Sequence, residues 1–295
     1  MITPRVTVGI PVYNGASTLE AAVRPLLEQT FEDIEVLVSD NASIDDTPAV
    51  VARLAREDPR IRYVRQPINL GANGNYSFVA RDARGEFLKW ASASDWCAPT
   101  FIERCVAALD ADPGAVVAAP RTRLFEGDIA SAIDYDGDLE ILGETPLERL
   151  KDILKRQRLN NAFNGLIRLD ALRRTRLVEP YLLADEVLMG NLALMGRILL
   201  VDEPLFWRRM EVGTSTTLQD ADSRLWHHYP DRSARWLLQA WKQQIGWLRA
   251  GWTAPMRPSQ RRAVMTYLLR RVGWERRSLA ADLRGALRFA LRHTQ

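Results

Sequence analysis

Short apolar runs of strand length alternate with helical patterns along most of the chain. The alternation of apolar and small or polar residues over 6–10 predicts a first strand. A helix should follow, because the apolar positions within 19–27 share one helical face and Ser17 and Glu20 have the spacing of a capping box. Pro25 would remove a backbone hydrogen bond from that helix, so we expect a kink or a later start there.

The same cycle repeats along the chain, which defines the fold class. Thr47 and Pro48 have the character of an N-cap and a first helical residue. Strands alternating with helices of this length predict right-handed βαβ units in an α/β fold, with a doubly wound, mostly parallel sheet and helices on both faces. Further strands are predicted over 34–39, 61–65, 87–91, 116–119 and 198–201, and further helices over 47–56, 75–84, 99–112, 145–158 and 185–195.

The sequence changes character near residue 221, where Trp residues occur among Arg and Lys in helical patterns. We therefore predict one domain over 1–220 and a helical C-terminal extension over 221–295. Residues 256–295 hold ten Arg against two acidic residues, although the whole chain carries only +3. The extension is either an amphipathic helix that meets an anionic membrane surface or a helix packed on the domain with its charges in water. No nucleic-acid-binding motif accompanies the charge, so we expect no nucleic acid partner.

Composition narrows the class of protein further. With 47% hydrophobic and 26% charged residues, the 295-residue chain is typical of globular proteins. Cys97 and Cys105 cannot build a disulfide framework, and we expect both to pack in the core from one helix. The start of the chain lacks the pattern of a signal peptide and no long apolar run follows, so a cytoplasmic location is expected, with any membrane contact peripheral on the inner face.

Polar groups follow three of the predicted strands. Tyr13-Asn14, Asp40-Asn41 and the segment 92–95 should converge, because ligands of an open parallel sheet bind at the carboxyl ends of its strands. Neither a G-x-G-x-x-G sequence nor a P-loop is present, so phosphate must be held in another way.

Four motifs carry a specific resemblance. The segments Val8–Asn14, Glu28-Gln29-Thr30, Glu35–Thr47 and Asn69–Asn73 resemble the family 2 glycosyltransferases with a GT-A fold, and the resemblance covers residues 5 to about 210. It implies a nucleotide-diphosphate sugar donor, with Asp40 hydrogen-bonding the base and Tyr13 packing on it. The expected nucleotide-binding residues are Pro11, Tyr13, Asn14, Asp40, Asn41, Asn69 and Ser94. Asp40 also fits a turn residue bonded to its local backbone, and Tyr13 also fits a core aromatic.

The resemblance implies a divalent metal, Mn²⁺ or Mg²⁺, at an acidic motif that this chain has altered. The family's Asp-x-Asp-Asp positions read Ser-Ala-Ser-Asp at 92–95, so we expect weak metal binding with Asp95 as a ligand. Asp95 also fits a helix N-cap. Glu211 stands where the family often has a metal-reaching His, and either completes the ligands or faces solvent. Arg208 and Arg209 are candidate ligands of the donor diphosphate, although one of them can be a surface charge.

The same resemblance makes Asp185 the catalytic base, eleven residues before Gly196. A role as a helix cap is the alternative for Asp185, and Glu186 is the reserve base. The predicted activity is inverting, hexosyltransferase-like transfer from a UDP- or dTDP-sugar to a hydroxyl of a glycan, lipid-linked or small-molecule acceptor, in polysaccharide biosynthesis. The alternative is a catalytically silent nucleotide-sugar-binding scaffold. A nucleotidyltransferase is disfavoured, because no Gly-rich triphosphate loop follows the first strand.

Overall fold

The computed structural model describes residues 3–92, 95–210 and 237–293. Within these ranges, nine strands form one mixed sheet in the order β3-β2-β1-β4-β8-β6-β9-β5, with β7 paired to β6. Strands β1 to β4 pair in parallel, as do β6 and β9, whereas β5, β7 and β8 pair antiparallel with their neighbours. The strands are β1 (Val6–Val12), β2 (Ile34–Asp40), β3 (Ile61–Arg65), β4 (Phe87–Trp90), β5 (Trp96–Cys97), β6 (Ala115–Phe125), β7 (Ile133–Asp134), β8 (Leu166–Arg168) and β9 (Arg197–Arg209).

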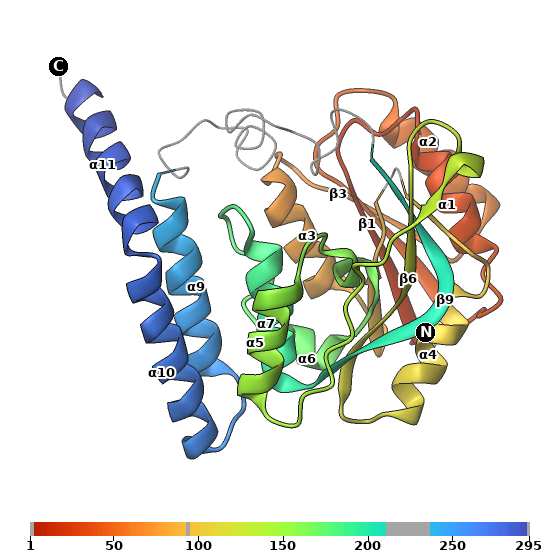
Figure 1. Cartoon of the computed structure of the whole chain (residues 1–295). Helices are drawn as coiled ribbons and strands as arrows, with labels where there is room; N and C mark the ends of the chain where they lie inside the picture. Colours follow the sequence, from red (N-terminus) through yellow and green to blue (C-terminus); the bar gives the residue numbers. More distant parts are fainter. Residues whose placement is uncertain (1–2, 93–94, 211–236, 294–295) are drawn as a thin grey trace.

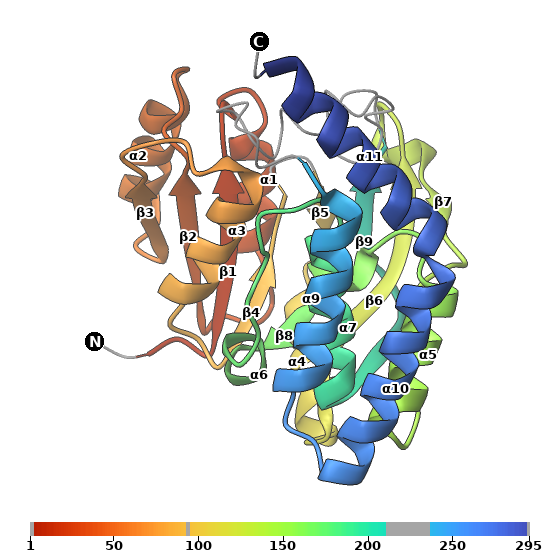
Figure 2. The same ribbon diagram turned by 90° about the vertical axis from the view of Figure 1, so that its left-hand side faces the viewer.

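Helices cover both faces of the sheet, as the sequence predicts (Figures 1 and 2). One face is covered by α1 (Leu19–Leu27), α2 (Thr47–Glu57) and α4 (Phe101–Ala111), and the other by α3 (Gly71–Asp82), α5 (Pro146–Arg156), α6 (Leu169–Arg173) and α7 (Ala184–Met195). The 3-10 helices η1 (Ile129–Ser131) and η2 (Asn161–Asn164) lie in the connections between these elements. Beyond them follow α9 (Gln239–Thr253), α10 (Pro258–Trp274) and α11 (Arg276–His293). The predicted α/β class is confirmed.

Several predicted helix starts are wrong. Helix α1 begins after Thr18, without the predicted capping box, and continues through Pro25. The N-cap of α2 is Asp46, because the predicted cap Thr47 is already helical and donates its hydroxyl to Asp45. Helix α3 starts at Gly71, four residues earlier than predicted, where a left-handed φ of 73° suits glycine.

Two predicted strands are longer than expected, and one cysteine is misplaced. Strands β6 and β9 pair with each other along almost their whole lengths, through three register shifts, so each extends well past its apolar run. Cys97 lies on β5 and only Cys105 lies on a helix, so the expectation of a shared helix is wrong, although both are buried. A capping box that the sequence analysis missed joins Thr145 and Glu148 at the start of α5.

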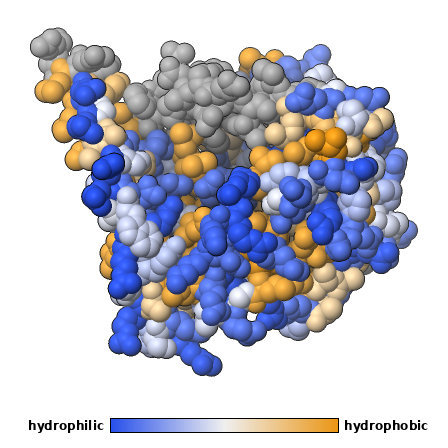
Figure 3. Space-filling model, in the orientation of Figure 1, coloured by the Kyte–Doolittle hydropathy of each residue, from blue (hydrophilic) through white to orange (hydrophobic). Residues whose placement is uncertain are grey.

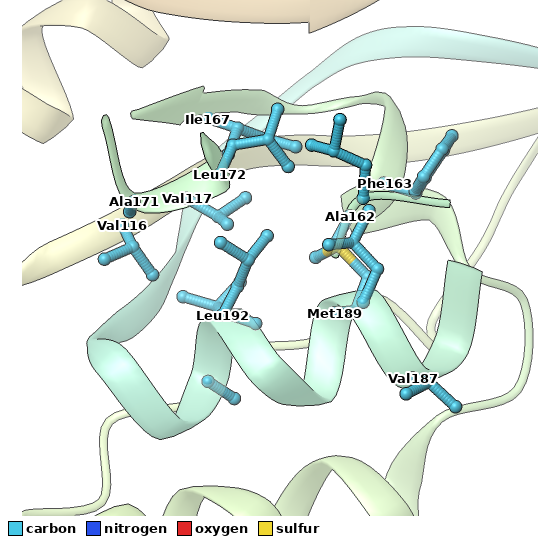
Figure 4. Packing of buried hydrophobic residues seen from close by; sticks show 14 of the residues in the cluster. Val116, Val117, Ala162, Phe163, Ile167, Ala171, Leu172, Val187, Met189 and Leu192 are labelled. Atoms are coloured by element: carbon cyan, nitrogen blue, oxygen red, sulfur yellow. The ribbon is translucent and has the colours of Figure 1, made fainter. Parts of the chain in front are cut away.

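The helices after residue 237 pack on the rest of the chain. Trp247 of α9, together with residues of α10, belongs to the same hydrophobic cluster as α7. Figure 4 shows the other side of α7, where Met189 and Leu192 point toward Val117 and Ala162 beside the sheet. Helix α7 is therefore held between the sheet and α9. The predicted boundary between 1–220 and 221–295 lies outside the described residues and stays a prediction.

None of the helices in the described ranges is both long enough and apolar enough to cross a membrane.

Candidate active site

The loops after β1 and β2 are tied together at the carboxyl edge of the sheet. The two strands run in parallel register, which places Val12 opposite Asp40 and Pro11 opposite Ser39. Asn14 adopts a left-handed φ of 51°, its backbone N–H donates to Ser43 Oγ (2.9 Å), and its Oδ1 accepts from the backbone N–H of Ile44 (3.0 Å). The predicted nucleotide-binding residues of these two strands therefore share one edge.

Asp40 is fully buried, and both of its carboxylate oxygens already have partners. Oδ1 accepts from the backbone N–H of Ser43 (2.8 Å), and Oδ2 accepts from the Tyr63 hydroxyl (2.8 Å) with Arg65 Nε at 3.6 Å. Burial and the bond to Asp40 raise the pKa of Tyr63 to about 12. The local backbone bond of the turn interpretation is thus present. A base would reach this carboxylate after the half-exposed Arg65 side chain moves aside.

Tyr13 is 39% exposed, so its interpretation as a core aromatic is wrong. Its ring lies on the surface beside the Asp40 loop and is available for stacking. The Asn41 and Asn69 side chains are used within the fold, because Asn41 Nδ2 donates to Asn69 Oδ1 (2.8 Å) and Asn69 Oδ1 also accepts from Gly71 N–H (2.8 Å). These bonds fix the loop that enters α3.

Three charged residues from distant parts of the chain converge around Tyr76. Burial, together with the charges of Asp95 and Asp185 and against that of Arg208, raises the pKa of Tyr76 to about 12. These neighbours come from the β4–β5 connection, α7 and β9. The Tyr76 ring lies in an aromatic cluster with Trp90 and Phe163, which stack on each other at 4.5 Å between centroids.

Asp95 is held by the backbone of β9. Its Oδ1 accepts from the backbone N–H of Arg209 (3.1 Å). Burial raises the pKa of Asp95, whereas the Arg209 bond and the charges of Arg208, Lys89 and Arg209 act to lower it. The N-cap of α4 is Thr100, so the N-cap interpretation of Asp95 is wrong.

Asp95 is the one predicted metal ligand that lies within the described residues. Within residues 3–92, 95–210 and 237–293, no group of three or more His, Cys, Asp or Glu side chains could hold a metal ion. Asp95 instead has three cationic neighbours, Lys89, Arg208 and Arg209. The predicted metal ligand Glu211 and the predicted nucleotide ligand Ser94 lie outside the described residues.

Asp185 lies in the first turn of α7 and faces the connection before β8. The N-cap position belongs to Leu183, which has a left-handed φ of 61°, so Asp185 does not occupy the capping position. Asn160 Nδ2 donates to Asp185 Oδ2 at 2.8 Å. The neighbouring Glu186 is partly buried, and burial together with the Asp185 charge raises its pKa to about 7.

The two predicted diphosphate ligands differ in their surroundings. Arg208 Nη1 donates to Asn161 Oδ1 (2.7 Å), and its charge acts on both Tyr76 and Asp95. The Arg209 guanidinium lies 4.8 Å from the centroid of the Phe125 ring. The Arg208 side chain is thus tied to the segment that contains Asn161.

Four residues of this region were missed at the sequence level. Tyr76, Asn160 and Asn161 surround the charged groups, and the buried Lys89 ammonium lies 4.3 Å from the centroid of the Phe101 ring. Lys89 Nζ also donates to the carbonyl of Asn164 (3.0 Å), and burial lowers its pKa. The available signals were a lysine within an apolar strand and two adjacent asparagines in an aperiodic stretch.

A mixed sheet with polar groups at the carboxyl ends of its parallel strands agrees with the predicted GT-A fold. The model of the family described as "Glycosyl transferase family 2" matches residues 7–173, more than half of the chain. The chain belongs to glycosyl transferase family 2, as its motifs predict.

Individual relatives match over shorter stretches. A GalNAc(5)-diNAcBac-PP-undecaprenol beta-1,3-glucosyltransferase of Campylobacter jejuni is 38% identical over 93 residues, which are 31% of this chain and 30% of that protein. The succinoglycan biosynthesis protein ExoO of Rhizobium meliloti is 31% identical over 151 residues, which are 51% of this chain and 40% of ExoO. The matched segments thus span less than half of these relatives.

Solved structures share the fold over nearly the whole chain. S. aureus TarS in complex with UDP aligns with a TM-score of 0.63 and 14% identity over 91% of this chain and 71% of that one. The mannosyltransferase PcManGT from Pyrobaculum calidifontis, solved with GDP-Man and Mn²⁺, aligns with a TM-score of 0.53 and 17% identity over 100% of this chain and 89% of that one. At these identities the likeness concerns the fold, and the predicted GT-A architecture is confirmed.

Proposed function

We propose that this protein is an inverting glycosyltransferase that moves a hexosyl group from a nucleotide-diphosphate sugar to an acceptor hydroxyl. The observation that carries the proposal is that the adjacent residues Asn160 and Asn161 bond Asp185 (2.8 Å) and Arg208 (2.7 Å), which brings a carboxylate and a guanidinium from distant parts of the chain into one region. The acceptor oxygen forms a bond to the anomeric carbon while the bond to the diphosphate oxygen breaks. The hydroxyl proton passes to Asp185, and Arg208 stabilises the charge that develops on the leaving diphosphate.

The nucleotide would lie over the loops after β1 and β2. Tyr13 stacks on the base, and Asp40 accepts from a base N–H once Arg65 has moved. A uracil or thymine base presents an N–H that suits a carboxylate, so UDP- and dTDP-sugars are the favoured donors. TarS crystallised with UDP and UDP-GlcNAc supports a uridine donor, whereas PcManGT with GDP-Man shows that the same fold takes another base.

Protein cations carry part of the charge of the leaving diphosphate in this proposal, because the acidic motif keeps Asp95 but reads Ser at 92 and 94. The divalent ion that the resemblance implies, and that PcManGT was solved with, would carry the rest. Arg208 is anchored through Asn161 and points its charge at the cluster, and Arg209 follows it on β9. Guanidinium groups bind phosphate oxygens through paired hydrogen bonds, which suits this task. Asp95 then has the role of orienting Arg209 through its backbone N–H.

We propose a glycan or lipid-linked acceptor, because the relatives include an undecaprenol-linked glucosyltransferase and a succinoglycan biosynthesis protein. Helix α11 supplies a matching surface for the cytoplasmic face of a membrane. Leu283, Leu287 and Leu291 are 45%, 57% and 71% exposed at four-residue spacing, with exposed Arg284 and Arg288 beside them. Figure 3 shows hydrophobic and hydrophilic residues side by side along this helix, at the upper left. Such a face suits anionic lipid headgroups over an apolar interface.

Vesicle sedimentation tests the membrane contact. We expect binding to phosphatidylglycerol vesicles that salt weakens, little binding to phosphatidylcholine, and loss of binding in Leu287→Glu. Leu142→Glu is the control. Leu142 and Leu283 are both 45% exposed, but Leu142 lies far from α11 along the chain. Equal binding of both variants would remove α11 from the interaction.

The catalytic proposal is tested with Asp185→Asn. We expect donor binding to survive while transfer to an acceptor falls by roughly 10²-fold or more, the usual contribution of a positioned base. Asp170→Asn is the control, because Asp170 also lies in the first turn of a helix and pairs with the exposed Arg174 (3.4 Å). Wild-type transfer by Asp185→Asn would refute the base assignment. Nucleotide-sugar binding without turnover of any donor, including slow hydrolysis, would favour the scaffold alternative.

A further inference from the structure

Two adjacent asparagines connect the proposed base to the proposed diphosphate ligand. Asn160 Nδ2 donates to Asp185 Oδ2 at 2.8 Å, and Asn161 Oδ1 accepts from Arg208 Nη1 at 2.7 Å. Asp185 is on α7 and Arg208 is on β9, so the pair joins two elements that carry opposite ends of the proposed reaction. The Asp185 carboxylate accepts hydrogen bonds, and Asn160 presents its amide nitrogen to it. The Arg208 guanidinium donates, and Asn161 presents its amide oxygen to it.

The segment that bears the two asparagines is itself anchored. Asn161 is buried, and its Nδ2 donates to Asp138 Oδ1 (3.0 Å). The same oxygen accepts from the Thr122 hydroxyl (2.8 Å), and Asp138 Oδ2 accepts from the backbone N–H of Thr122 (2.5 Å), so the chain of bonds ends on β6. Two residues further on, Phe163 stacks on Trp90 of β4. The segment is therefore fixed to the sheet on both sides.

We propose that Asn160 and Asn161 form a positioning element that sets the placement of Asp185 relative to Arg208, and through them of the acceptor hydroxyl relative to the leaving diphosphate. This inference rests on the proposed function of the same site. Neither asparagine needs to touch substrate. Positioning of reacting groups contributes strongly to transfer rates, and a displacement of about 1 Å is costly.

The two bonds have different expected effects. The Asn160 bond occupies Asp185 Oδ2, which leaves Oδ1 to take the acceptor proton. The Asn161 bond holds the Arg208 guanidinium in one orientation. Loss of the first bond should therefore lower kcat, and loss of the second should weaken the binding of nucleotide diphosphate.

Other charged groups that face Asp185 must be kept constant in the test. Glu186 on the same helix and Tyr76 on α3 both interact with its charge. Arg208 on β9 also acts on Tyr76, and Arg271 of α10 acts on Glu186. None of these residues is altered in the Asn160 variants.

The experiment compares Asn160→Ala, Asn161→Ala and the control Asn164→Ala. Asn164 lies in the same 3-10 helix, and the described contacts give its side chain no hydrogen bond. Steady-state transfer assays give kcat and KM, and calorimetry gives Kd for UDP. In Asn160→Ala we expect kcat to fall by roughly tenfold while Kd for UDP stays unchanged, because the base loses its orienting bond and the donor site is not altered. In an Asp185→Asn background the same change should cost little more, because the side chain that Asn160 positions has already been replaced.

For Asn161→Ala we expect Kd for UDP, measured by calorimetry, to rise by roughly three- to tenfold while kcat at saturating donor changes less than in Asn160→Ala. If loss of the Asp138 bond prevents folding, Arg208→Lys tests the same contact, because it keeps the charge and removes the guanidinium fork. Asn164→Ala should match the wild type in both measurements.

The outcomes separate this inference from the proposed function. If Asp185→Asn transfers at the wild-type rate, the proposed function fails. If Asp185→Asn loses transfer while Asn160→Ala keeps the wild-type rate, the proposed function stands and the positioning role is overturned. An equal loss of rate from Asn160→Ala in the wild-type and the Asp185→Asn backgrounds also overturns it, because that pattern describes a purely structural residue.

Discussion

The packing of α9 on α7 depends on the missing side chain of Gly190. A Cβ at this position would lie 2.1 Å from Cζ3 and 2.4 Å from Cη2 of Trp247, far inside van der Waals contact. The Trp247 ring is 2% exposed and belongs to the core cluster that includes α7. Neither the ring nor the helix backbone has room to yield, so Gly190→Ala should separate the two helices.

The expected magnitude follows from two opposing effects. In an unobstructed helix interior, Gly→Ala stabilises by roughly 0.5–1 kcal/mol. Overpacking a filled core costs roughly 1–3 kcal/mol, and a clash with a rigid ring belongs at the upper end of that range. We therefore expect Gly190→Ala to lower the free energy of unfolding by about 2 kcal/mol. Gly285→Ala in α11 is the control and should be neutral or stabilising, because a Cβ there meets no atom within 4 Å.

A double-mutant cycle isolates the clash. Trp247→Leu removes the two clashing ring atoms and by itself should cost somewhat less than the roughly 3–5 kcal/mol of truncation to Ala. In that background Gly190→Ala should become neutral or stabilising, so the pair should show a coupling energy of about 2 kcal/mol. Urea unfolding followed by far-UV circular dichroism measures all four proteins. If Gly190→Ala costs the same in both backgrounds, the steric reasoning is refuted.

Three further predictions concern the site. Asp40→Asn should weaken UDP binding by about 1–3 kcal/mol in calorimetry, and an unchanged affinity would remove Asp40 from base recognition. Transfer should require Mn²⁺ or Mg²⁺, at a higher concentration than a full acidic motif needs, because the motif keeps only Asp95 and cations surround it; full activity after exhaustive chelation would contradict this. In the folded state the pKa of Glu186 is about 7, above the usual 4.5, so the wild-type protein loses stability as the pH rises from about 4.5 to about 7. Glu186→Gln should therefore raise Tm at pH 8 but not at pH 4. A Tm difference independent of pH would count against this assignment.

The limits of a strand could be predicted from the sequence where its apolar residues are buried along its whole length. Strands β1 and β2 are buried along almost their whole length, so their apolar runs coincide with their limits to within a residue or two. The limits of β6 and β9 could not be predicted in this way, because the outer halves of these strands pair with each other and are not marked by buried apolar residues. The short strand β5 exists only through its pairing with β9, and its two residues carry no recognisable pattern alone.

Some residues of the candidate site could be placed from the sequence, and others could not. Asp40, Asn14 and Asn41 could be placed from the sequence, because parallel strands in register bring their carboxyl ends to one edge. Their local bonds span few residues or join neighbouring strands. The roles of Asp95, Asp185 and Arg208 came from the motif resemblance, which supplies residue types but no surroundings.

What the sequence alone determined is the alternation of strands and helices, the family motifs and the polar ends of the first strands. Only the tertiary structure decided that Asn160 meets Asp185 across 25 positions, that Asn161 meets Arg208 across 47, and that Trp247 fills the space above Gly190. The physical reason is that periodicity reports whether a residue is buried, not which residue it faces. Partners distant in sequence are selected by the packing of whole helices and strands against one another, and that packing places these two asparagines between α7 and β9.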